Sequence, residues 1–315
     1  MSNTQIIITG SIAYDYLMCF PGSFSEHILP EHTERLSLSF LVDQMERRRG
    51  GCAPNIAYTL ALLGERPRVM GAAGRDFDEY REWLESIGVD TSLIYVNPHK
   101  FTASFFCNTD RHNNQIASFY SGAMADARNL SFYELDFKPD LVIISPNDPI
   151  AMQRYAAECR ELDITFVYDP GQQVARSSGE ELKEGLRGAQ MLICNDYEFQ
   201  IIRQKTQLGV QELLEEVELL VITRGAAGSQ VITRHEVIDI PAVPEKHVAD
   251  PTGVGDAFRA GFLKGLAVGA PLDVCGKLGS VAATYALEHV GGQGHYFKWE
   301  DFKQRYEAHF GPLSL

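Results

Sequence analysis

The stretch ADPTGVGDAF, which starts at Ala249, places two glycines directly before an aspartate. Glycine inside a regular element costs about 0.5–1 kcal/mol, so Gly253 and Gly255 indicate either a tight turn or a backbone that approaches a ligand closely. Apolar residues then recur at helical spacing, as at Phe258 and Phe262. The glycines are therefore expected at the N-terminus of a helix, where free N–H groups and the helix dipole attract anions.

This arrangement suits the transfer of a phosphoryl group to a hydroxyl group. The backbone amides of Gly253, Val254 and Gly255 would stabilise charge on the transferring group, while Asp256 would accept the proton of the hydroxyl. A purely structural alternative stays open on spacing alone: an ordinary helix start with Asp256 as a common first-turn residue.

Other patterns that bind phosphate or metal are absent from the sequence. It contains neither the GxxxxGK[ST] loop nor a GxGxxG motif after a strand, and it lacks the HRD and DFG signatures of protein kinases. The nine histidines form no HExxH pair, which argues against a zinc site.

Five short apolar runs are typical of strands that are buried on both faces: QIIIT, LVIIS, TFVYD, MLICN and LLVIT. Polar or small residues stand at the ends of four of these runs, namely Gly10, Asp169, Asn195 and Thr223. Each could be a simple turn former. Ligands of open parallel sheets bind outside the carboxyl ends of the strands, however, so their joint placement predicts one cleft.

Amphipathic stretches between these runs predict helices at Asn55–Leu63, Asp78–Ile87 and Ile150–Leu162. Alternating strands and helices imply a mainly parallel sheet with helices on both faces. Two regions break the alternation, residues 16–46 and 101–121, and the second alternates like a hairpin around TDRHNN. We expect both to project from the sheet as a lid; long surface loops are the alternative.

Composition limits the partners. The 315 residues carry a formal charge of −14, which argues against nucleic acid. The six cysteines form no CxxC pair and indicate free thiols in a reducing compartment. The N-terminal residues do not form a secretion signal, and no apolar run reaches the roughly 18 residues of a membrane helix. These features predict a cytoplasmic protein that binds small molecules, not membranes.

Four motifs, taken in order, resemble the signatures of the ribokinase-like (PfkB) superfamily of sugar and nucleoside kinases. DPTGVGDAF is similar to the family's C-terminal DTxGAGD signature, and RGGCAPNIAYTLALLG at Arg49–Gly64 is similar to its N-terminal signature. NDYE at 195–198 matches the family's NxxE element, and TRGAAG at 223–228 matches its nucleotide-side turn. The resemblance implies one ribokinase-like α/β domain over residues 1–315.

In such a domain the central, mainly parallel sheet has helices on both faces, and a small β-rich lid would be formed here by about residues 13–48 and 98–121. The resemblance assigns Asp256 as the catalytic base and Gly253–Gly255 as the anion hole. It also implies that three residues hold the hydroxyls of the phosphate acceptor: Asp15, Gly51 and Asn55.

The resemblance further implies an ATP site and metal sites. The residues expected along ATP are Asn195, Thr223, Gly225 and Gly228, with Ser280 and Ala283 near the adenine. Asn195 and Glu198 would organise Mg²⁺ through water. Many relatives also bind potassium near the anion hole, and its local ligands here would be Asp250 and Thr252.

The acceptor is predicted to be a nucleoside, with adenosine or another purine riboside first. GSIAYD and DPGQ resemble bacterial adenosine and nucleoside kinases, and Cys52 stands where ribokinases often have lysine. DPGQ also lacks the basic residue of the common DxNxR pattern. Lid aromatics such as Phe106 and Phe119 would stack on the base. The alternatives are a sugar kinase of ribokinase or fructokinase type, or a catalytically idle ligand-binding protein; a monomer or a homodimer is expected.

Overall fold

The computed structural model of the protein describes residues 4–27 and 37–315. Within these residues, nine strands form one sheet in which β12 runs antiparallel to both neighbours and the other pairs are parallel. From edge to edge the strands are β13 (Val237–Ile240), β12 (Ser229–Ile232), β11 (Leu219–Thr223), β10 (Met191–Asn195), β9 (Phe166–Tyr168), β8 (Leu141–Ile144), β1 (Ile6–Thr9), β4 (Arg68–Gly74) and β5 (Ile94–Asn97). The predicted mainly parallel sheet is confirmed.

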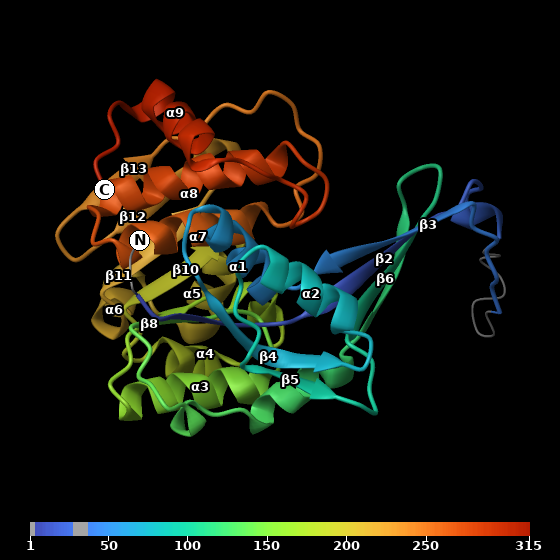
Figure 1. Ribbon diagram of the computed structural model, residues 1–315, viewed down its shortest axis with the longest axis horizontal. Coiled ribbons are helices and arrows are strands. Elements are labelled where there is room, and N and C mark those ends of the chain that lie inside the picture. Colours follow the sequence, from blue (N-terminus) through green and yellow to red (C-terminus); the bar gives the residue numbers. More distant parts are fainter. Residues whose placement is uncertain (1–3, 28–36) are drawn as a thin grey trace.

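Helices cover both faces of this sheet (Figure 1). The helices on one face are α1 (Cys52–Leu62), α2 (Asp78–Ser86), α7 (Val254–Ala267) and α8 (Leu272–Leu287), with α9 (Trp299–Phe310) packed on α8. The helices on the other face are α3 (Pro149–Glu161), α4 (Gly179–Leu186), α5 (Asp196–Thr206) and α6 (Val210–Glu216). Short 3₁₀ helices lie between them: η1 (Phe24–Glu26), η3 (Gly122–Asn129), η4 (Phe132–Glu134), η5 (Gly171–Ala175) and η6 (Gly225–Ala227).

The uninterrupted apolar strands follow from burial on both faces. In β1, Ile6 and Ile8 join the core beneath α1, α2 and α7, while Ile7 joins the core beneath α3. Side chains alternate between the two faces of a strand, so a strand covered by helices on both sides must be apolar throughout.

The predicted lid is a second sheet that projects from the main body (Figure 1). Its strands, in spatial order, are β3 (Gln44–Gly50), β2 (Ala13–Cys19), β6 (Ala103–Thr109) and β7 (Gln115–Tyr120). The hairpin expected around TDRHNN is the β6–β7 pair. β3 continues to Gly50, two residues beyond the predicted lid segment, and residues 28–36 of that segment lie outside the described residues.

Helix α1 begins at Cys52, three residues before the predicted start at Asn55. Gly51 caps it with a φ of 96°, and a Cβ there would lie 2.4 Å from the carbonyl oxygen of Ser11. Pro54 falls in the first turn, where its missing N–H needs no helical partner. None of the helices in residues 4–27 and 37–315 has the length and hydropathy needed to cross a bilayer.

Candidate active site

Asp256 lies in the first turn of α7, as the sequence predicted. The N-cap is Gly253, whose φ of 76° and ψ of 0° are left-handed. A Cβ at this position would stand 2.5 Å from the Cα of Gly292, so neither the conformation nor the space admits a side chain. The first-turn amides of α7 are the groups that a helix leaves without intrahelical partners, and they adjoin the Asp256 carboxylate.

Asn55 of α1 holds Asp256 across the site: its Nδ2 donates to Asp256 Oδ2 at 2.9 Å. Asp256 is half-buried. Burial raises the pKa of Asp256 to about 7, although Arg259 and the Asn55 hydrogen bond act in the opposite direction. A carboxylate that ionises near neutral pH can accept a proton from a bound hydroxyl group.

Arg259 forms a buried ion pair next to Asp256 that sequence reasoning missed. It lies one turn further along α7, and its Nη2 donates to Asp169 Oδ1 at 2.5 Å. The side chains of Arg259 and Asp169 are 9% and 1% exposed, and Ser145 Oγ donates to the other Asp169 oxygen at 2.9 Å. The available signal was an arginine inside the otherwise apolar stretch that follows Asp256. Arg259 thus brings a cation to the segment where DPGQ lacks one.

Asn195 and Glu198 form a capping box at the start of α5. Asn195 Oδ1 accepts from the Glu198 N–H at 2.7 Å, and Glu198 Oε2 accepts from the Asn195 N–H at 2.9 Å. The box uses one carboxylate oxygen, so the second can hold a metal-bound water, and these residues fit the expected role toward Mg²⁺. Burial raises the pKa of Glu198, and the charge of Asp169 acts in the same direction.

The other residues expected along ATP lie at the end of β11 and on α8. Thr223 pairs in register with Asn195, which places both strand ends side by side. Gly225 and Gly228 have φ angles of 54° and 81° in the turn that follows. Two further expected residues lie on α8: Ser280, whose Oγ donates to the carbonyl of residue 241 at 2.9 Å, and the half-buried Ala283.

Asp15 of β2 lies on the lid face that turns toward α7. It is opposite Arg48 of β3, and Arg48 Nη1 donates to Asp250 Oδ2 at 3.3 Å in the segment that precedes α7. A Cβ at Gly50 would stand 2.6 Å from Asp15 Oδ2, so the bare backbone beside Gly51 lets the carboxylate lie close. Burial raises the pKa of Asp15, while Arg48 acts to lower it.

The register of the lid strands shows which aromatic side chains share a face with Asp15. Asp15 is opposite Phe105 in β6, and Phe105 is opposite Phe119 in β7, so these three side chains share a face. Phe106 is opposite Tyr16, and their rings stack at 4.8 Å on the other face. Phe106 therefore lies on the face opposite Asp15, because adjacent strand residues point to opposite faces. Phe105 is the residue that shares the face of Asp15 with Phe119.

Asp250, one of the two residues expected to bind potassium, accepts three hydrogen bonds. Asp250 Oδ1 accepts from the Thr252 N–H at 2.9 Å, and Oδ2 accepts from the Gly291 N–H at 2.9 Å as well as from Arg48. Despite partial burial, these contacts lower the pKa of Asp250. In the part of the chain that the structure describes, no cluster of three or more His, Cys, Asp or Glu residues could hold a metal ion. Potassium binding by Asp250 and Thr252 stays a prediction.

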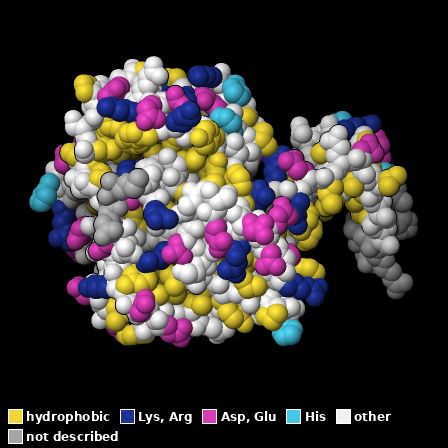
Figure 2. All heavy atoms as spheres, in the orientation of Figure 1, with side chains coloured by type: hydrophobic (Ala, Val, Ile, Leu, Met, Phe, Trp, Pro, Cys, Tyr) yellow, Lys and Arg dark blue, Asp and Glu magenta, His cyan; other side chains and the backbone are white. Residues whose placement is uncertain are grey.

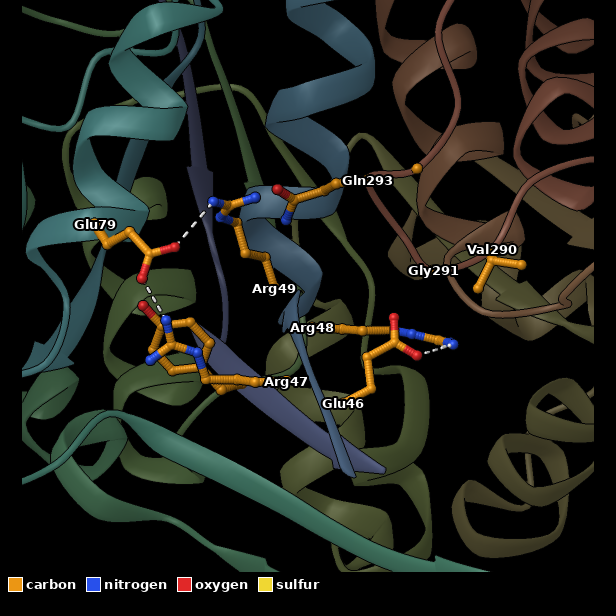
Figure 3. A pocket seen from close by; sticks show the side chains of 10 residues that line it. Glu46, Arg47, Arg48, Arg49, Glu79, Val290, Gly291 and Gln293 are labelled. Carbon is orange, nitrogen blue, oxygen red and sulfur yellow. Dashed lines mark hydrogen bonds and ion pairs between the residues drawn. The ribbon is translucent and has the colours of Figure 1, made fainter. Parts of the chain in front are cut away.

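A cavity of about 240 Å³ adjoins the site where the lid leaves the main body. Its walls come from the basic run of β3, from α2 and from the loop 290–294 (Figure 3). Arg47 and Arg49 both contact Glu79, while Arg48 contacts Glu46. Figure 2 shows side chains of both charges gathered at this junction. The run of three arginines is thus largely neutralised by its neighbours.

A mainly parallel α/β sheet with its candidate site at the strand ends, and a small β lid projecting from it, defines the class of ribokinase-like proteins. The model of the pfkB family carbohydrate kinases matches residues 12–297, and the chain belongs to that family. A nucleoside kinase from Methanothermobacter thermautotrophicus is 31% identical over 311 residues, which make up 98% of this chain and 97% of the relative.

Solved structures agree with this assignment. Burkholderia thailandensis nucleoside kinase in complex with inosine has 36% sequence identity and a TM-score of 0.86, with 97% of this chain and 98% of that chain covered. The nucleoside kinase of Methanocaldococcus jannaschii has 28% identity and a TM-score of 0.85, with 98% and 99% covered. The predicted ribokinase-like fold is confirmed.

Proposed function

We propose that the protein transfers the γ-phosphoryl group of ATP to the 5′-hydroxyl of a ribonucleoside, with adenosine or another purine riboside as the preferred acceptor. The observation that carries this proposal is Asp256: a carboxylate at the N-terminus of α7, with a pKa raised by burial to about 7 and a hydrogen bond from Asn55. The relatives named nucleoside kinases, one of them solved with inosine, support the acceptor class.

In the proposed reaction, Asp256 accepts the proton of the 5′-hydroxyl as its oxygen attacks the γ-phosphorus, and ADP leaves with the electrons of the broken P–O bond. The amides of Gly253, Val254 and Gly255 stabilise charge on the transferring group. Mg²⁺, when bound through waters near Asn195 and Glu198, would neutralise charge on the phosphates. The capping box fixes where those two side chains point.

The shared lid face supports a nucleoside over a free sugar. Asp15 can accept hydrogen bonds from two ribose hydroxyls, and Phe105 and Phe119 flank it on the same face. Stacking of a base on an aromatic ring contributes roughly 1–3 kcal/mol in comparable sites. A free sugar has no planar group that could gain this energy.

The acceptor is tested by kcat/KM for adenosine, inosine, guanosine, cytidine, ribose and fructose at one ATP concentration. We expect the purine nucleosides to rank first. If ribose or fructose exceeds every nucleoside, the chain is a sugar kinase. If no acceptor releases ADP, the catalytically idle alternative holds.

The catalytic base is tested by Asp256→Asn. We expect turnover to fall by about 10²-fold or more, the usual scale of acid–base catalysis, with ATP affinity roughly unchanged. Glu180→Gln is a suitable control, because this exposed helix residue lies on α4 across the sheet from α7. Near-wild-type turnover of Asp256→Asn would overturn the base assignment.

Two further proposals concern the cellular state of the protein. All six cysteines are free thiols, which supports a cytoplasmic location.

A monomer or a homodimer is proposed. The homodimer is favoured by apolar side chains that are exposed on the lid face opposite Asp15, namely Met45, Phe106, Ile116 and Tyr120. Light scattering coupled to size-exclusion chromatography distinguishes the two states.

A further inference from the structure

A chain of hydrogen bonds reaches the Asp256 carboxylate from α2. Trp83 Nε1 donates to Gln293 Oε1 at 3.1 Å, and Gln293 Nε2 donates to Asn55 Oδ1 at 3.0 Å. Asn55 Nδ2 then donates to Asp256 Oδ2 at 2.9 Å. Four residues from separate segments of the chain thus meet in one line that ends at the candidate base.

The direction of this chain is fixed by groups that can play only one role. An indole N–H is a donor only, so the oxygen of Gln293 must face Trp83 and its NH₂ group must face Asn55. The Gln293 NH₂ group also contacts the hydroxyl of Tyr80, which donates its own proton to the carbonyl of Gly50 at 2.9 Å. A backbone carbonyl accepts only, so both partners impose the same orientation on Gln293.

The orientation of Gln293 in turn fixes that of Asn55. The two ends of a carboxamide are nearly equal in size, so hydrogen bonds and not shape decide which end faces which partner. With Oδ1 held by Gln293, the NH₂ group of Asn55 faces Asp256. In the reverse orientation Asn55 would place an oxygen against the carboxylate, and the two acceptors would repel each other.

Gln293 lines the cavity, whereas its partners Asn55 and Tyr80 are shielded from water. Asn55 is 5% exposed and Tyr80 is fully buried. A Cβ at Gly292 would lie 2.5 Å from Asn55 Nδ2, so the backbone of the loop presses against the amide. On the cavity side, Arg49 lies over the Trp83 ring at 4.8 Å, and Figure 3 shows Arg49 beside Gln293.

From this geometry we infer that Gln293 is a positioning residue for phosphoryl transfer, which orients the amide of Asn55 so that Asn55 donates to Asp256. The inference rests on the proposed role of Asp256 as the base. Gln293 itself does not touch the acceptor; it acts through Asn55.

The charges around Asp256 show why this donor matters. Arg259 on α7 lowers the pKa of Asp256, while burial, Asp169 after β9 and Glu198 on α5 raise it. Burial and, after it, the charge of Asp256 raise the pKa of the Cys52 thiol on α1. The other contribution that lowers the pKa of Asp256 is the hydrogen bond from Asn55. Among these contributions, only this hydrogen bond depends on the orientation of an amide. Loss of that orientation should therefore raise the pKa of the base.

The test is Gln293→Met, which keeps the length of the side chain and removes its hydrogen bonds without adding a charge. With a nucleoside acceptor and ATP, we expect kcat near pH 7 to fall roughly three- to tenfold, the effect of one net hydrogen bond. The acidic limb of the kcat profile should move upward by about half a pH unit. Gln293→Glu, which can accept from Trp83 but cannot donate to Asn55, should shift the limb further.

A double-mutant cycle separates positioning from a merely structural role. In an Asn55→Ala background, Gln293→Met should lower kcat no further and leave the acidic limb in place, and thermal melts confirm that each variant is folded. The inference is overturned if Gln293→Met alone leaves the acidic limb of the kcat profile in place. It is also overturned if Gln293→Met lowers kcat equally in the wild-type and Asn55→Ala backgrounds. Asp256→Asn is measured alongside. High turnover of Asp256→Asn overturns the role of Asp256 as the base. Low turnover of Asp256→Asn together with an unchanged kcat profile of Gln293→Met overturns only the positioning role of Gln293.

Discussion

At the scale of single residues, the two glycines before Asp256 are required for different reasons. Gly253 adopts a left-handed conformation. Gly255 instead leaves space for the side chain of Arg259, because a Cβ at residue 255 would lie 2.8 Å from Nη1 of Arg259. The guanidinium cannot easily move, because it is buried and bound to Asp169. The sequence motif therefore combines a backbone constraint with a packing constraint.

Gly255→Ala should displace the Arg259 guanidinium and lower both turnover and stability. Overpacking a well-packed interior costs about 1–3 kcal/mol, which urea unfolding at pH 7 would measure. In a variant that also carries Arg259→Met, the added methyl group should cost much less. An equal loss of stability in both backgrounds would mean that Arg259 does not set the space at residue 255.

The buried Asp256 should also make stability depend on pH. Because burial raises its pKa from 3.8 to about 7, the native state keeps a proton that the unfolded chain has lost between these values. Native stability should thus fall as pH rises across this window. Asp256→Asn removes the effect. The Tm of the variant should therefore rise relative to the Tm of the wild type as the pH increases from 5 to 8. A constant Tm difference over this range would contradict the pKa shift.

Local spacing predicted where some of the candidate residues lie in the fold. Gly253 and Asp256 follow from the spacing of a single helix start. The contacts of Arg259 with Asp169 and of Gln293 with Asn55 join positions 90 and 238 residues apart, and no local pattern records them. The choice between Phe105 and Phe106 depended on strand register, which a hairpin pattern alone does not fix.

At the scale of elements, apolar runs were a reliable guide because a strand covered by helices on both faces must be apolar throughout. The lid was predicted as strands but not in its order. β2 pairs in parallel with β6, about ninety residues later, and β6 then pairs with β7 across a short turn. Only the second pairing is local, so only the hairpin was visible in the sequence.

The β6–β7 turn offers a test of lid movement. If the lid closes on the acceptor, tryptic cleavage after Arg111, whose side chain is 50% exposed, should slow when nucleoside is added. Arg187, which is 63% exposed at the end of α4, is the matched site on the main body and should be cleaved at the same rate throughout. Mass spectrometry of timed digests measures both. Equal rates at Arg111 with and without nucleoside would argue against closure.

At the scale of the whole molecule, the residues proposed to bind the acceptor are divided between the lid and the main body. Asp15, Phe105 and Phe119 belong to the lid, whereas Asn55 and Asp256 belong to helices on the main sheet. The lid extends outward from that sheet (Figure 1). An acceptor that contacts both sets must bridge them, so its binding energy can be used to draw the lid toward α7.

Small-angle X-ray scattering should detect this closure as a smaller radius of gyration when adenosine and ADP are added together. ADP alone should change it little, because the residues expected along the nucleotide all lie on the main body. Asp15→Asn supplies the control: it weakens the lid's hold on the ribose hydroxyls, so more adenosine should be needed for the same change. If ADP alone produces the full change, the nucleotide and not the acceptor closes the lid. If neither ligand changes the radius, the lid face of Asp15 does not bridge to Asp256 through the acceptor.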